Sequence, residues 1–204
     1  MNSKLTFKNK KVIVFDLDGT IAKLAADWHS LKDALAERYT EYYQDECQFM
    51  SISACLSNIV KRNDEEELKK NFEIIRQYEL ENIKESIPIE ETVFFINNLS
   101  SFGVQEDTKL AVLSLNTRRT IIESLKLANL YEKIDFIVGR EDVRKWKPEP
   151  EGLLKIKEYF NVEKVEMVFI GDLDKDLLTG QNAGIESFLV DELIELVNDF
   201  KKES

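Results

Sequence analysis

The sequence has little of what disulfide-linked, zinc-binding and membrane-spanning proteins need. Its two cysteines, Cys47 and Cys55, lie eight residues apart in a segment of helical pattern; that spacing is about 12 Å of helix, too far for a disulfide. A single histidine, His29, leaves a zinc site without its usual ligands. The longest apolar runs have four residues, whereas roughly 20 are needed to cross a bilayer. Residues 1–11 are charged but lack the apolar core of a signal peptide, so we expect a cytoplasmic protein.

Positive charge is also scarce. Lys and Arg number 28 against 39 Asp and Glu, which gives a formal net charge of −11. This balance disfavours binding to nucleic acid or to an anionic membrane, because both need a basic surface. With 43% apolar residues in 204, the chain is long enough for a hydrophobic core and fits one domain, or one domain with an insert.

The order of apolar patterns predicts an α/β protein. Residues 11–15 read as a buried strand, and a helical pattern follows from about 21 to 87. Strands and helices then alternate, which is typical of a parallel sheet. We expect strands at 109–115, 136–138, 167–170 and 188–190 and helices at 89–101, 118–127, 151–160 and 176–182. The fold class is a Rossmann-like parallel sheet core with helices on both faces, formed by residues 1–21 and 88–204, plus an inserted α-helical cap at 22–87.

Polar residues follow four of the apolar segments. They are Asp16 and Asp18, Ser114 and Asn116, Lys147, and Asp172 with Asp174 and Asp176. Ligands of open parallel sheets bind outside the carboxyl ends of the strands. We therefore expect residues from distant parts of the sequence to meet in one site.

The chemistry of these residues favours phosphoryl transfer. Asp16, Asp18 and Asp172 offer only oxygen ligands, which suit Mg²⁺, and Lys147 and Ser114 supply a charge and a hydroxyl for a phosphoryl group. A carboxylate can itself attack phosphorus. Residues i and i+2 share a face of extended chain, so Asp16 and Asp18 could act on one phosphorus as nucleophile and general acid/base.

Four motifs together resemble the haloacid dehalogenase (HAD) superfamily, in its phosphoglycolate-phosphatase-like branch with a helical cap. They occur in family order: VFDLDGT at 14–20, LAVLSLN at 110–116, KWKPEPEG at 145–152 and VFIGDLDKDLLTGQNAG at 168–184. The second motif departs from the family pattern because Leu115 separates Ser114 from Asn116.

The resemblance implies a metal site and a nucleophile. Asp16 would be the nucleophile and a Mg²⁺ ligand. Asp18 would be the general acid/base and would bind Mg²⁺ through its backbone carbonyl, and Asp172 would be the third protein ligand.

The resemblance also implies how phosphate is bound. Ser114 and Lys147 would hold the phosphoryl group, with Asn116 assisting. Asp176 would orient Lys147 or a metal-bound water.

The function that follows is hydrolysis of a small phosphomonoester with Mg²⁺, by an enzyme that is a monomer or homodimer. Phosphoglycolate is the favoured substrate, and sugar phosphates, nucleotides and pyrophosphate are open. A phosphomutase of the same fold, a receiver-like module phosphorylated on Asp, and a non-catalytic binding scaffold are the alternatives. A receiver would be shorter and lack the helical insert; a scaffold would be expected to lose Asp16 or Asp18.

Several other polar residues have ordinary explanations. Asp174 fits a helix cap or a solvent-facing position, and the acidic run 64–67 fits a solvated helix N-terminus. Trp28 and His29 begin the expected cap and could touch substrate, but a packing or interfacial role is the commoner explanation. Four arginines near the expected site could bind an anion but are more simply solvated: Arg118, Arg119, Arg140 and Arg144.

Overall fold

A parallel sheet forms the centre of the molecule. The computed structural model describes residues 5–45 and 51–203, and within them five strands pair in the order β5-β4-β1-β6-β7, all parallel. The strands are β1 Val12–Phe15, β4 Lys109–Leu113, β5 Phe136–Val138, β6 Met167–Gly171 and β7 Glu186–Leu189. The predicted fold class is confirmed.

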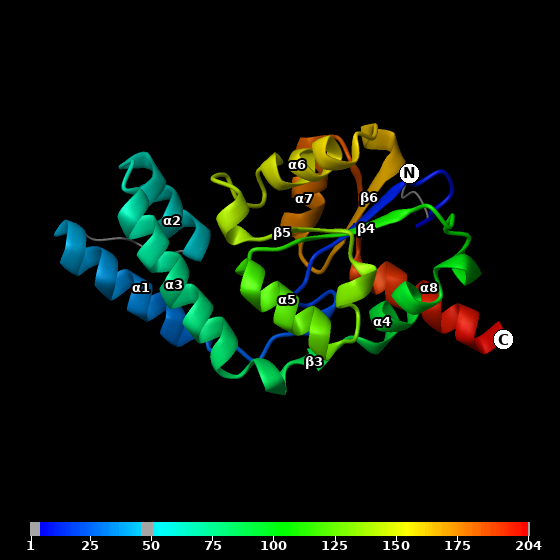
Figure 1. The fold of residues 1–204 in the computed structure, drawn as a ribbon, viewed down its shortest axis with the longest axis horizontal. Helices are drawn as coiled ribbons and strands as arrows, with labels where there is room; N and C mark the ends of the chain where they lie inside the picture. The colour runs from blue at the N-terminus through cyan, green and yellow to red at the C-terminus, as the bar shows by residue number, and fades with distance from the viewer. Residues whose placement is uncertain (1–4, 46–50, 204) are drawn as a thin grey trace.

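Helices cover both faces of this sheet (Figure 1). They are α4 Glu90–Asn97, α5 Arg118–Leu127, α6 Glu151–Phe160, α7 Asp174–Ala183 and α8 Val190–Glu203. The strand pattern explains the two layers, because alternate residues of a strand point to opposite faces. Ile13 and Phe15 belong to the core under α4, α5 and α8, whereas Val12 and Val14 belong to the core under α6 and α7. A strand buried on both faces must be apolar at every position, as β1 is.

The remaining helices lie beyond one end of the sheet (Figure 1). They are α1 Trp28–Tyr43, α2 Ile52–Lys61 and α3 Glu65–Glu81. Short strands at the two ends of this segment, β2 Ala22–Lys23 and β3 Ile87–Pro88, pair antiparallel and bring entry and exit together. The division into a core and a cap at 22–87 stays a prediction, because the apolar residues of α1–α3 are continuous with the core under α6 and α7.

Some predicted boundaries were wrong for local reasons. The predicted helix 89–101 ends at Asn97 and continues as a 3-10 turn at Leu99–Phe102. The predicted strand 109–115 ends at Leu113, because the chain then turns into the site. The predicted strand 188–190 is β7, which lies at 186–189. The short strands β2 and β3 were not predicted.

The acidic run at 64–67 only partly behaves as a solvated helix end. Asp64 is the N-cap of α3 and accepts from the Glu67 backbone N–H at 3.0 Å. Glu67 itself is fully buried and binds the Arg38 guanidinium through two bonds of 2.6 and 2.7 Å. The solvated interpretation is wrong for Glu67, because α1 packs against α3 at this position.

Two further predictions touch the limits of the described chain. Cys55 lies buried in α2, and Cys47 lies outside the described residues, so the predicted separation of the two cysteines stays a prediction. Within residues 5–45 and 51–203, no helix is long and apolar enough to cross a membrane.

Candidate functional site

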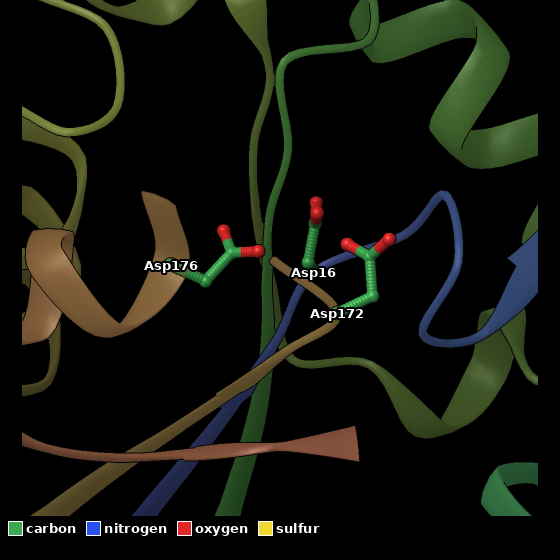
Figure 2. Close-up of side chains that lie close together, drawn as sticks. All are labelled: Asp16, Asp172 and Asp176. Carbon is green, nitrogen blue, oxygen red and sulfur yellow. The ribbon is translucent and has the colours of Figure 1, made fainter. Parts of the chain in front are cut away.

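Three carboxylates meet at the carboxyl ends of β1 and β6. Asp16 follows β1 directly, Asp172 follows β6, and Asp176 lies in the first turn of α7. One oxygen of each lies within 4.8 Å of the others, and Figure 2 shows the three side chains gathered at one point. The glycines beside them allow this approach: a Cβ at Gly19 or Gly171 would overlap the carboxylate of Asp172 or Asp176.

Lys147 partly neutralises the cluster. Its Nζ lies 2.9 Å from Asp16 Oδ2 and 2.6 Å from Asp176 Oδ1. The side chains of Lys147, Asp16 and Asp176 are nearly inaccessible to solvent. Such a buried cation must be paired, because its desolvation is costly. Asp176 also accepts from the Leu173 backbone N–H, so it holds Lys147 from a fixed position.

Burial perturbs the acids and the lysine differently. Desolvation raises the pKa of Asp16, despite the opposing charge of Lys147, and it raises the pKa of Asp18. Desolvation, reinforced by the negative charge of Asp16, raises the pKa of Asp172 to about 6. Burial opposes the charge of Lys147, but the carboxylates of Asp16 and Asp176 outweigh it and raise the pKa of this lysine. The acids are therefore crowded by negative charge that one lysine does not balance.

The cluster has the properties of a site for a hard divalent cation. Asp172 Oδ1 is buried and has no hydrogen-bond partner among the described residues, and such an orphaned acceptor is costly unless a cation or donor meets it. The atoms that could bind the metal are all carboxylate oxygens, which are ligands that suit Mg²⁺. The residues present therefore fit the metal. The Asp18 carboxylate lies outside this group and accepts from the Leu24 backbone N–H at 2.9 Å; a role for its backbone carbonyl stays a prediction.

The loop after β4 carries the other predicted phosphate ligands. Ser114 Oγ donates to Asn116 Oδ1 at 2.8 Å, and the Asn116 backbone N–H donates back to Ser114 Oγ at 3.2 Å. Asn116 Nδ2 donates to Glu79 Oε1 at 2.9 Å, and Glu79 Oε2 accepts from the backbone N–H and the hydroxyl of Thr117. Glu79 is 1% exposed and comes from α3. A helix of the inserted segment thus fixes the shape of this loop.

All seven predicted site residues line one pocket of about 410 Å³. They are Asp16, Asp18, Ser114, Asn116, Lys147, Asp172 and Asp176. The inserted helices add Trp28 and Lys32 from α1 and residues 51–53 at the start of α2. Asp174 is exposed at the start of α7 and does not line the pocket, whereas Trp28 does. The structure therefore brings the predicted residues together, and their roles are part of the proposal below.

Two buried charged residues beside the pocket were not predicted from the sequence: Glu79 was not singled out, and Arg140 was expected to be solvated. Glu79 continues the buried face of Leu68 and Ile75 at helical spacing, and an acid on an apolar face was the available signal. Arg140 was expected to be solvated but is 3% exposed and lines the pocket. The 3-10 turn after β5 carries it inward, where its carbonyl accepts from Trp146 Nε1 at 2.9 Å.

The other arginines behave as the solvated interpretation requires. Arg118 binds Asp142 and the Ile137 carbonyl. The remaining two form ion pairs with partly exposed partners: Arg119 with Glu123 and Arg144 with Glu65. None of the three lines the pocket.

Comparison with known proteins identifies the family. A sequence profile for haloacid dehalogenase-like hydrolases matches residues 13–190. The chain is 29% identical over 184 residues to the pyrophosphatase PpaX of Halalkalibacterium halodurans, covering 87% of this chain and 82% of that protein.

Solved structures share the fold. A predicted phosphoglycolate phosphatase from Haemophilus somnus 129PT is similar with a TM-score of 0.60 and 17% identity, covering 88% of this chain and 84% of its own. A HAD-superfamily hydrolase of subfamily IA from Geobacter sulfurreducens is similar with a TM-score of 0.56 and 18% identity. The match covers 94% of this chain and 97% of that hydrolase.

These matches confirm the enzyme class predicted from the sequence, a hydrolase of the phosphatase type. The profile covers all four sequence motifs, since only residues 1–12 and 191–204 fall outside it. The chain belongs to the family of haloacid dehalogenase-like hydrolases.

Proposed function

We propose that the protein is a Mg²⁺-dependent phosphatase that hydrolyses a small phosphorylated metabolite through an aspartyl-phosphate on Asp16. The observation that carries the proposal is the buried Asp16 carboxylate, held 2.9 Å from Lys147 and grouped with the carboxylates of Asp172 and Asp176. Asp16 Oδ1 accepts from the Leu17 backbone N–H at 2.7 Å, which fixes the carboxylate at the floor of the pocket.

The first step transfers the phosphoryl group. Asp16 attacks phosphorus, the bond from phosphorus to the leaving oxygen breaks, and Asp18 gives that oxygen its proton. Burial keeps the pKa of Asp18 raised, which favours the protonated form that this step needs. Lys147, with Ser114 nearby, stabilises the charge on the non-bridging oxygens.

The second step releases phosphate. Asp18, now deprotonated, takes a proton from a water molecule, which attacks phosphorus and restores the Asp16 carboxylate. The net reaction converts ester and water into alcohol and phosphate. Asp16, Asp172 and the backbone carbonyl of Asp18 would hold Mg²⁺, with Asp176 holding Lys147 beside them. When bound, the metal neutralises phosphate charge and the crowded acids.

The test is phosphate release from a panel of small esters, with Mg²⁺ and with a chelator. The panel includes pyrophosphate because the related PpaX proteins are named pyrophosphatases. Asp16→Asn should reduce turnover about a thousandfold or more. Asp174→Asn is the matched control, because Asp174 is exposed nearby but does not line the pocket.

Each outcome separates the candidates. Turnover that needs Mg²⁺ and disappears in Asp16→Asn supports the proposal. Turnover that survives Asp16→Asn rules out this nucleophile. If phosphoryl transfer occurs only with an added bisphosphate, and without net phosphate release, the phosphomutase alternative is correct.

A further inference from the structure

Arg140 is a buried charge that the reaction above does not use. Its Nε and Nη1 are buried, and among the described residues they have no hydrogen-bond partner; within the same residues the rest of its guanidinium takes part in no hydrogen bond either. A guanidinium has five N–H donors, so this is an unusual arrangement for a side chain that is 3% exposed.

The nearby acids do not satisfy this guanidinium. Glu79 and Glu141 attract it electrostatically. However, the Glu79 oxygens accept from Asn116 and Thr117, and Glu141 Oε2 accepts from the Arg118 backbone N–H at 2.9 Å. Desolvation lowers the pKa of Arg140 to about 10, which still leaves it positively charged at neutral pH. A buried guanidinium whose donors have no acceptor is costly even with acids nearby, and it persists where a ligand can supply the acceptor.

Arg140 lies beside the loop after β4, residues 114–117, which we call the phosphate loop. Its backbone N–H donates to the Asn116 carbonyl at 2.8 Å, so it lies next to the loop that carries Ser114 and Asn116. It lines the same pocket as Asp16, together with Lys32 from α1 and residues 51–53 at the N-terminus of α2. This wall of the pocket is therefore positive, in contrast to the acidic floor.

We propose that Arg140 binds a second oxyanion group of the substrate, apart from the phosphoryl group that is transferred. This inference rests on the proposed phosphatase function. It specifies the substrates of that enzyme as small phosphate esters or anhydrides that carry a further carboxylate or phosphate. A substrate with an uncharged leaving group would leave the buried guanidinium without an acceptor. Such a substrate should therefore bind less well than one with a second anion. Carboxylate and phosphate both match the planar fork of an arginine.

The experiment compares substrates that differ mainly in that group. Phosphoglycolate and ethyl phosphate share a two-carbon chain and differ by a carboxylate, and pyrophosphate tests a phosphate in its place. The measured quantity is the ratio of kcat/KM for each anionic substrate to kcat/KM for ethyl phosphate. We expect a ratio of at least about ten for one of the two in the wild type, and a fall of about ten- to a hundredfold in that ratio in Arg140→Gln. Arg140→Lys should recover part of it.

The matched control is Arg119→Gln. This arginine is exposed on α5, pairs with Glu123 and lies outside the pocket, so the ratio should keep its wild-type value. A purely structural role for Arg140 would lower kcat/KM for all substrates together and leave the ratio unchanged; that result would overturn the inference. A wild-type ratio near one for both anionic substrates would overturn it without any variant.

Failure of the proposed function is separable from failure of this inference. Ethyl phosphate turnover tests the phosphatase itself, because that substrate has no second anion. If no ester is hydrolysed, calorimetric binding of phosphonoacetate against ethylphosphonate makes the same comparison without turnover. Equal affinity for the two in the wild type rejects the inference, and preference for phosphonoacetate that is lost in Arg140→Gln supports it. Circular dichroism confirms that each variant is folded.

Discussion

Replacing Glu79 with glutamine should loosen the contact between helix α3 and the phosphate loop. Glu79 is a fully buried carboxylate that accepts three hydrogen bonds, at 2.9 Å from Asn116 Nδ2, 2.9 Å from the Thr117 backbone N–H and 2.7 Å from the Thr117 hydroxyl. Glutamine keeps the shape of the side chain but replaces one acceptor oxygen with an NH₂ group. At least one buried donor of the loop then faces another donor.

The expected loss of stability can be worked out from these three hydrogen bonds. A hydrogen bond to a charged group contributes about 1.5–3 kcal/mol, and a buried donor left without a partner costs about 1–3 kcal/mol. We expect Glu79→Gln to lower the free energy of unfolding by about 2–4 kcal/mol. In a chain of this size each kcal/mol lowers Tm by about 2–4 °C, so Tm should fall by about 4–16 °C.

The assay is thermal and urea unfolding, with kcat and KM measured on the same preparations. The control is Glu73→Gln on the same helix, where the carboxylate is exposed and pairs with Arg76. Its unfolding free energy should change by less than about 0.5–1 kcal/mol. If Glu79→Gln were as stable as Glu73→Gln, the idea that Glu79 anchors the loop to the inserted helices would be refuted.

Two further predictions concern a buried ion pair and the metal site. Arg38→Met should destabilise the protein by about 3–5 kcal/mol in urea unfolding, because it leaves the fully buried Glu67 carboxylate unpaired; a loss no larger than that of Arg76→Met at an exposed pair would contradict this. Mg²⁺ affinity, measured by calorimetry, should fall about fivefold from pH 6 to pH 5 but change little above pH 7. In the metal-free protein the pKa of Asp172 is raised to about 6, so below that pH the metal must displace a proton; constant affinity from pH 5 to 7 would rule this out.

The strands and most of the helices that frame the site could be predicted because their signals are local. A fully apolar run such as Val12–Phe15 identifies a strand buried on both faces. Asp16, Ser114 and Asp172 each follow such a run, and the topology of a parallel sheet places the ends of these runs together. The helices 118–127 and 151–160 were predicted with the boundaries that the structure shows.

The sequence by itself determined the sheet, the order of its elements and seven of the polar residues that line the pocket, because strand patterning and short motifs depend on neighbours along the chain. Only the tertiary structure decided which further charges are buried. Arg140 looks like a surface residue in the sequence, and Glu79 is marked only by its place on an apolar helix face, yet both are nearly inaccessible. Their burial depends on how helix α3 and the turn after β5 pack against the phosphate loop. Desolvation is a property of the packed whole, and local patterns record it only in part.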